Sequence, residues 1–268
     1  MVSMNHKSSG GIGGTDNDGL YRKPIVPSLD DEPIHILDEN ATQAKELLTE
    51  LHDSILSVSF PPEEYIRPPA PAEADGPALI ACQKDGLVLG GALGEWYPRS
   101  ESLLLAYLAV RPGFRAKGIG ELLMAAVVER WLSKVPLAFL ELDDPHHHAP
   151  HPGYGDPVAR LRFYARFGVR TLAIPYFQPS LADHLPRAYH LLLGVIAKER
   201  VEPPSTIPGA RVAAFIEEYF EVSEGSDALQ APEVQRLLRA CAVPEISLLS
   251  LRQTPRVAAI QNDVDHPK

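Results

Sequence analysis

The chain has 268 residues, of which 45% are hydrophobic and 22% charged, and it carries a formal net charge of −10. The length fits one large domain or two small ones, and the acidic balance disfavours a nucleic-acid binder, which needs a basic surface to engage phosphates. No apolar stretch approaches the roughly 20 residues that cross a bilayer, and the first residues lack the apolar segment of a secretory signal. We therefore expect a cytoplasmic protein without nucleic-acid or membrane partners.

The two ends of the chain are poor in large apolar side chains. Residues 1–30 are rich in Gly, Ser and Asp, and such a segment buries too little surface to offset the entropy lost on ordering. We expect residues 1–30 to be disordered and residues 253–268 to form a flexible tail.

Between the two ends, hydrophobic periodicity predicts strands and helices. A strand at 33–37 precedes an amphipathic helix, and the dipeptide Asp85-Gly86 predicts a hairpin between two later strands. In chain order, we expect strands at 33–37, 78–84, 87–96, 103–110, 137–142, 171–176 and 189–197, and helices from about residue 40, after the glycine-bearing turn 113–120, and at 156–167.

This order predicts an α/β (α+β) domain over residues 31–200, with a mixed, mostly antiparallel central sheet flanked by helices. After residue 200 the pattern changes to amphipathic helices, so we expect a helical C-terminal extension over residues 201–252. The extension is too small to form a stable domain alone. It is expected to pack on the main domain or on a second subunit, which leaves a homodimer open.

The run Arg115-Ala116-Lys117-Gly118-Ile119-Gly120 follows a buried strand and opens a helix. The first amides of a helix have no internal hydrogen-bond partner and lie at the positive end of the helix dipole, so they favour an anion. The two glycines let a diphosphate approach these amides, and the Arg and Lys side chains add cationic donors. The spacing fits neither a dinucleotide fingerprint nor a P-loop.

The same run, placed after a strand that ends Leu-Ala-Val-Arg-Pro, resembles the acetyl-CoA signature of the GNAT superfamily, whose core is R/Q-x-x-G-x-G/A. Residues 162–169, Arg-Phe-Tyr-Ala-Arg-Phe-Gly-Val, resemble the family's second signature, a helix with a late tyrosine that is stopped by glycine. The element order of residues 33–198 is also similar to the GNAT fold. The resemblance implies an N-acetyltransferase that moves an acetyl group directly from acetyl-CoA to a primary amine.

The resemblance also implies which residues bind acetyl-CoA, the co-substrate. The backbone of the third strand of the meander would pair with the pantetheine arm as an added strand does, and the amides of the turn would hold the diphosphate. The implied residues are Leu108, Ala109, Val110, Arg115, Ala116, Lys117, Gly118, Ile119 and Gly120.

For the chemistry, the resemblance implies that Tyr164 is the general acid, which protonates the departing CoA thiolate. Glu141 is the leading candidate for the base, because Phe139-Leu140-Glu141-Leu142 resembles the L-E-V stretch of amino-terminal protein acetyltransferases in this superfamily. Other members carry an acidic residue early in the preceding strand, where this chain has Leu104. The base therefore stays open between Glu141, the neighbouring Asp143 and a histidine of the loop that follows.

The acceptor side is less specified by the sequence. The family's loop after the first helix usually covers the acceptor, and the turn between the last two strands faces the same region. A long loop at 143–155 holds four histidines, and we weigh a substrate-contacting loop against a solvated one and expect no metal, because no Cys joins them. The candidate substrate residues are Glu63, Glu64, Tyr65, Asp143, His148 and Tyr176.

The acceptor is expected to be a small amine, an amino sugar or the amino group of a peptide. A non-catalytic acyl-CoA-binding module of the same fold, with the C-terminal helices as its interaction surface, is the alternative. A metal-dependent hydrolase built on the histidine loop fits the anion site least well.

Overall fold

The computed structural model describes residues 28–29, 32–62, 64–66, 76–135, 137–197 and 204–251. The predictions of disorder for residues 1–30 and 253–268 therefore lie outside the described residues, except at Ser28–Leu29, which form strand β1. Strand β1 pairs with β2, Glu32–Pro33, in a small separate sheet.

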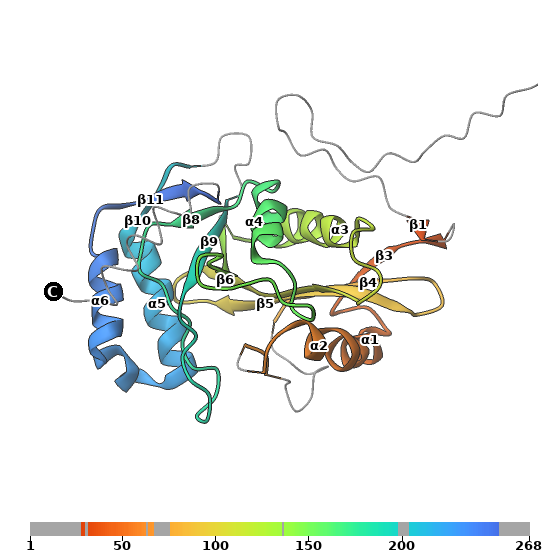
Figure 1. The fold of residues 1–268 in the computed structure, drawn as a ribbon, viewed down its shortest axis with the longest axis horizontal. Coiled ribbons are helices and arrows are strands. Elements are labelled where there is room, and N and C mark those ends of the chain that lie inside the picture. The colour runs from red at the N-terminus through yellow and green to blue at the C-terminus, as the bar shows by residue number, and fades with distance from the viewer. Residues whose placement is uncertain are drawn as a thin grey trace, which may run out of the picture.

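A nine-stranded sheet runs through the molecule in the order β10-β11-β8-β9-β7-β6-β5-β4-β3 (Figure 1). Neighbouring strands are antiparallel except β6 and β7, which are parallel. The predicted mixed, mostly antiparallel sheet is confirmed. Its strands are β3 His35–Asp38, β4 Ala78–Cys82, β5 Val88–Tyr97, β6 Ser102–Val110, β7 Leu137–Asp143, β8 Arg170–Leu172, β9 Leu191–Ala197, β10 Thr206–Pro208 and β11 Glu245–Ser250.

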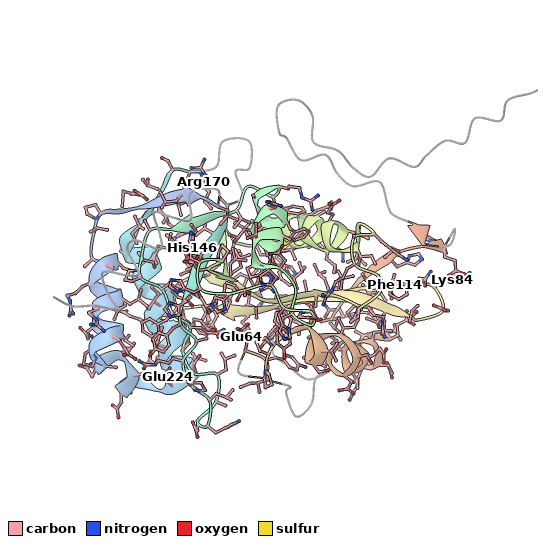
Figure 2. The ribbon with its side chains drawn as sticks, viewed as in Figure 1. Glu64, Lys84, Phe114, His146, Arg170 and Glu224 are labelled. Atoms are coloured by element: carbon pink, nitrogen blue, oxygen red, sulfur yellow. The ribbon has the colours of Figure 1, made fainter. Side chains whose placement is uncertain are left out.

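Helices cover both faces of this sheet (Figure 1), and Figure 2 shows the side chains that fill the space between the layers. Side chains alternate along a strand, so Leu103 and Leu105 pack against α3 on one face while Leu104 packs against α5 on the other. That second face is shared by α1 and α5. The helices are α1 Ala44–Leu51, η1 His52–Leu56, α2 Ser57–Ser59, α3 Ile119–Ala126, η3 Val127–Trp131, α4 Pro157–Ala165, α5 Gly209–Glu224, η4 Ser226–Gln230 and α6 Pro232–Cys241.

The C-terminal extension contains the expected helices, but it also adds strands to the main sheet. Strand β11 pairs with β8, and β10 pairs with β11. The sequence prediction of helices alone missed both strands, β10 before α5 and β11 directly after Pro244. Ile246 and Leu248 are buried while Glu245 and Ser247 between them are exposed, the alternation of a half-buried strand. The domain division at residue 200 stays a prediction.

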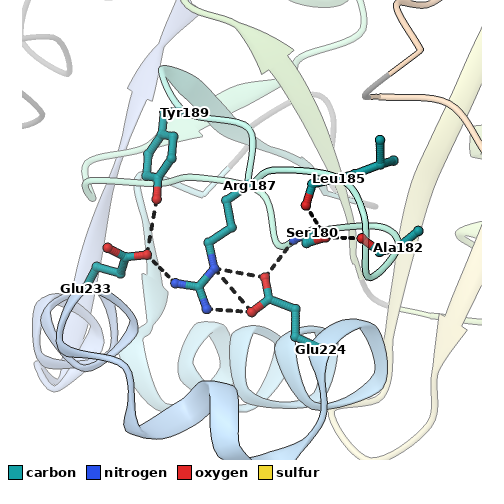
Figure 3. Close-up of polar contacts among 7 residues, drawn as sticks. All are labelled: Ser180, Ala182, Leu185, Arg187, Tyr189, Glu224 and Glu233. Carbon is teal, nitrogen blue, oxygen red and sulfur yellow. Dashed lines mark hydrogen bonds and ion pairs between the residues drawn. The ribbon is translucent and has the colours of Figure 1, made fainter.

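A polar network fixes this extension to the loop between β8 and β9 (Figure 3). Arg187 from that loop donates to Glu224 of α5 and Glu233 of α6, and its guanidinium lies over the ring of Phe220. The backbone amide of Ser180 also donates to Glu224 at 2.6 Å. The Arg187 side chain is only 15% exposed. Its ion pairs with the two helices are therefore screened less than ion pairs on the surface.

No helix in the described part of the chain is long and apolar enough to span a bilayer.

Candidate active site

The site begins where two parallel strands separate. Strands β6 and β7 pair only from Leu103–Ala138 to Leu105–Leu140, although both strands continue for several residues. On its other edge, β6 has a bulge at Ala106, because Leu105 pairs with Gly94 and Tyr107 with Leu93. A bulge bends a strand and redirects its side chains, so β6 leaves β7 at this point.

A cavity of about 620 Å³ occupies the gap, and we call it the large cavity. It extends from the turn before α3, along the free edge of β6, to the end of β7 and the exposed side of α4. Its lining residues include Ala106, Leu108, Ala109, Val110, Arg115, Ala116, Gly118, Gly120, Glu141, Arg160, Tyr164 and Arg166. The structure therefore brings the two predicted catalytic residues and most of the predicted CoA-binding residues into one cavity.

The turn before α3 presents free backbone amides at one end of this cavity. Gly118 caps the helix with φ 83°, a left-handed conformation that glycine adopts without steric cost. The first backbone hydrogen bond of the helix runs from Leu122 to the carbonyl of Gly118, so the amides of the preceding helical residues have no acceptor within the helix. This is the geometry of an anion site.

Two of the predicted CoA-binding residues do not line the large cavity with their side chains. Ile119 is completely buried in the core beneath α3, and the Lys117 ammonium lies 5.1 Å from the centre of the Phe114 ring. The cationic side chains that line the cavity are instead Arg115 and two arginines from α4 and its end, Arg160 and Arg166, which pair with Asp143 and Glu121. The sequence analysis assigned neither of these two arginines.

Glu141 lies at the inner end of the large cavity and is held by three donors. Tyr176 donates its hydroxyl to Oε1 at 2.5 Å, and Gln178 donates its amide to Oε2 at 2.7 Å. Tyr219 from α5 adds a third donor, its hydroxyl, at 3.4 Å. Burial raises the pKa of Glu141 to about 7; the hydrogen bonds oppose this rise, and the negative charge of Glu95 adds to it. A carboxyl group with this pKa can exchange a proton near neutral pH.

Tyr164 faces the same cavity from α4 and is 7% exposed. Asp156 begins this helix as predicted, because its side chain accepts the amide of Val158 at 2.9 Å and Pro157 follows it. Burial raises the pKa of Tyr164 to about 12, partly offset by the nearby charge of Arg160. The phenol therefore keeps its proton at neutral pH and can act as an acid.

The predicted substrate residues lie in three different environments. Glu63 lies outside the described residues. Glu64 accepts the Tyr107 hydroxyl through its carbonyl, and Tyr65 bonds to His52 at 2.7 Å, so both belong to the loop that packs against α1 and β6. Neither is among the residues that line the large cavity.

The other three candidates lie near the end of β7. Tyr176 is buried and holds Glu141, as described above. Asp143 forms an ion pair with Arg160 at 2.8 Å, and His148 lies 4.0 Å from the same carboxylate. Of the two candidate carboxylates on β7, Glu141 lines the large cavity and Asp143 does not. Asp143 is instead the ion-pair partner of Arg160, which lines the cavity.

The histidines of the loop at 143–155 point to separate partners. His146 bonds to the buried Asp144 at 2.8 Å, His147 stacks on His190, and His151 stacks on Tyr154. Among the described residues, no group of three or more His, Cys, Asp or Glu side chains is arranged to hold a metal ion.

Comparison with known families gives a match that covers the strand, turn and helix just described. Residues 75–171 match the family model described as an acetyltransferase (GNAT) domain. The chain contains a GNAT acetyltransferase domain. The predicted family, the GNAT fold and the enzyme class, an acyltransferase, are thereby confirmed.

Comparison with solved structures also gives matches to GNAT proteins, all at low identity and with TM-scores below 0.5. A protein of Bacteroides thetaiotaomicron assigned to the GNAT acetyltransferases is 20% identical, with a TM-score of 0.45 over 70% of this chain and 98% of that one. The ribosomal-protein-S18-alanine N-acetyltransferase of Escherichia coli is 10% identical, with a TM-score of 0.39 over 61% and 93% of the two chains. An Elizabethkingia anophelis GNAT acetyltransferase with acetyl-CoA bound is 13% identical, with a TM-score of 0.35 over 61% and 97%. No curated protein sequence matches the chain.

Two of the donors to Glu141, Tyr219 and Gln178, lie far from it in the sequence, and the sequence analysis did not predict their contacts with it. Tyr219 lies 78 positions from Glu141, on a helix whose sequence indicated only an apolar stripe. Gln178 lies in the turn between the last two strands, which the family resemblance placed toward the acceptor without assigning Gln178 a partner. No local signal predicts that these two residues contact Glu141, because only the packing of α5 and of the loop between β8 and β9 brings them to β7.

Proposed function

We propose that this GNAT domain transfers an acetyl group directly from acetyl-CoA to a primary amine, with Glu141 as the base and Tyr164 as the acid. The observation that carries the proposal is that both side chains line one cavity, at the point where β6 and β7 separate. Their pKa values, about 7 and about 12, suit the two opposite roles.

The described residues fit acetyl-CoA in three ways. The glycine-capped turn and Arg115, Arg160 and Arg166 suit a diphosphate. The edge of β6 beyond Leu105 is free of β7 and can pair with an amide-containing arm. The buried hydroxyl of Ser59, which lines the cavity, has no hydrogen-bond partner in the described part of the chain, and a ligand amide would satisfy it.

In this mechanism, Glu141 accepts one proton from the acceptor ammonium and passes it to solvent, which frees the nitrogen lone pair. A carbon–nitrogen bond then forms at the acetyl carbon and the carbon–sulfur bond breaks. Tyr164 protonates the departing sulfur, and the remaining excess proton on nitrogen restores the phenol. The three donors on Glu141 keep its carboxylate in place during this exchange.

Release of free thiol from acetyl-CoA in the presence of a panel of primary amines tests the proposal. We expect amine-dependent release, and Tyr164→Phe should lower kcat by about 100-fold while leaving the affinity for CoA unchanged. Tyr154→Phe is a matched control, because Tyr154 lines the outer part of the same cavity and stacks on His151. Binding of CoA without thiol release across the panel would contradict the proposal.

A further inference from the structure

A second cavity of about 370 Å³, which we call the small cavity, lies beside Glu141. Both cavities are lined by Ala106, the bulge residue of β6. Tyr219 lines the small cavity, and its hydroxyl reaches Glu141 in the large one. A molecule in the small cavity therefore lies next to the proposed base.

The walls of the small cavity come from elements that share the second face of the sheet. Helix α1 and the π-helical turn η1 contribute Leu48 and His52, and α5 of the C-terminal extension contributes Tyr219, Val222 and Ser223. The extension thus closes a space that the main domain alone would leave open on one side.

The small cavity is acidic. Glu39 and Glu95 line it, and none of its described lining residues is Lys or Arg. Glu39 already holds the start of β4, because its Oε2 accepts the amide of Ala78 at 3.0 Å. Glu95 accepts only the Tyr97 hydroxyl, at 2.8 Å, among the contacts of the described residues, and it remains exposed to the cavity. Glu95 is the carboxylate that a ligand can reach.

Aromatic rings complete the surroundings of Glu95. Tyr97, Tyr107 and Tyr219 line the cavity together with the aliphatic side chains of Leu48 and Leu93. Rings and aliphatic walls favour a slender hydrocarbon chain, and tyrosine faces also attract a cation. Desolvation within the fold raises the pKa of Glu95, and a bound cation would oppose that rise.

We propose that the small cavity binds the far end of an acceptor that carries a second positive charge, so that the substrate class is the free aliphatic diamines. One amino group lies at Glu141 and the other, as an ammonium, pairs with Glu95. This inference rests on the proposed function, because it assigns the acceptor of the same reaction.

The test compares three acceptor series of increasing chain length: α,ω-diaminoalkanes, linear alkylamines and ω-amino acids. We expect kcat/KM for the best diamine to exceed that of the matched alkylamine by about ten- to hundred-fold, the range of one charge-assisted hydrogen bond. The amino acids should be the poorest acceptors, because their carboxylate meets Glu95. Equal kcat/KM for diamines and alkylamines would overturn the inference and leave the proposed function intact.

Two variants locate the preference. Glu95→Gln should lower the diamine-to-alkylamine ratio of kcat/KM by about tenfold or more. Val222→Arg, at a position that is 72% exposed and lines the cavity, should lower the same ratio by adding a positive charge without disturbing the core. Glu46→Gln removes the same charge from the exposed surface of α1 and should leave the ratio unchanged. A ratio that survives both cavity variants would overturn the inference.

A binding measurement separates this inference from the proposed function. Calorimetric titration of the diamines onto the protein with CoA reports the small cavity without any transfer. Diamine binding that is weakened by Glu95→Gln supports the inference. If such binding occurred but no thiol were released, only the proposed function would be contradicted. No heat of binding, together with no diamine preference, would overturn the inference.

Discussion

The two cavities differ in how the chain builds them. Most walls of the large cavity come from two continuous stretches, residues 105–121 and 154–166, each of which carries a recognisable motif. The small cavity takes its walls from residues as far apart as Glu39 and Ser223, without a motif. The first is lined by Arg115, Arg160 and Arg166 together with three carboxylates, whereas the second is lined by Glu39 and Glu95 with no Lys or Arg among its described residues. The difference shows that local backbone geometry makes the anion site, whereas tertiary packing makes the proposed acceptor site.

The largest effect is expected at the junction of the two cavities. Glu141→Gln should lower kcat by about 1,000-fold, because general-base catalysis typically contributes a factor of this order. Activity of the unaltered protein should rise with pH through about 7, since the carboxyl group must lose its proton to act as a base. Thiol release measured across pH should lose this rise in the variant.

Asp143→Asn is the matched control, because Asp143 is nearby but paired with Arg160. If Asp143→Asn removed the pH dependence while Glu141→Gln kept it, Asp143 would be the base and the junction would lie elsewhere.

The same carboxyl group should make stability depend on pH. Its pKa in the folded chain is about 7 against an ordinary value of 4.5, so the folded state binds the proton more tightly and loses stability as pH rises from about 4.5 to above 7. The size is about 3 kcal/mol for a rise of this extent. Urea unfolding at about pH 5 and about pH 9 should show this loss in the unaltered protein.

Glu141→Gln should remove that share of the pH dependence, because an amide does not titrate in this range. If the unaltered protein and Glu141→Gln differed in free energy of unfolding by the same amount at both pH values, the folded environment would not raise the pKa of Glu141.

The next largest effect is expected at Arg187, which joins the loop between β8 and β9 to the helices of the C-terminal extension. Arg187→Met leaves Glu224 and Glu233 without their guanidinium partner (Figure 3), and it should lower the free energy of unfolding by about 2 kcal/mol. Diamine kcat/KM should fall with it, because the loop with Gln178 and Leu181 loses its anchor. The affinity for CoA should not change, since the large cavity is built locally.

Arg99→Met is the control for this change. Arg99 pairs with Glu221, which lies on α5 as Glu224 does. The Arg99 side chain is 57% exposed, and exposed ion pairs contribute little to stability. Equal destabilisation by the two variants in urea unfolding would show that the buried network has no special role.

The smallest effect is expected in the large cavity. Gly118→Ala should raise the Kd for CoA by about tenfold, because a non-glycine residue costs about 1–2 kcal/mol in the left-handed region and shifts the turn that presents the free amides of α3. Gly113→Ala has a similar positive φ, 85°, with no atom within 4 Å of the added carbon. Calorimetry should find a changed affinity only for Gly118→Ala; equal affinities would contradict the assignment of the anion site.

Much of the GNAT domain was readable from the chain. Apolar runs and the Asp85-Gly86 turn predicted β4, β5 and β6, and Asp156 predicted the start of α4. The strand expected at 171–176 is shorter, since β8 ends at Leu172. Strand β10 was missed because its three residues are too few for a period to be recognised. Strand β11 does alternate between buried and exposed residues, but the sequence analysis did not assign it.

The sequence by itself determined the family and the anion site, because a glycine-bearing turn before a helix creates free amides from neighbouring residues alone. Only the tertiary structure decided which carboxylate is buried at the strand split, and which residues surround it. The raised pKa of Glu141 depends on the water that α5 and the β8–β9 loop exclude, while the donors from Tyr176, Gln178 and Tyr219 oppose the rise. Desolvation is a property of everything packed around a group, so no local pattern records it.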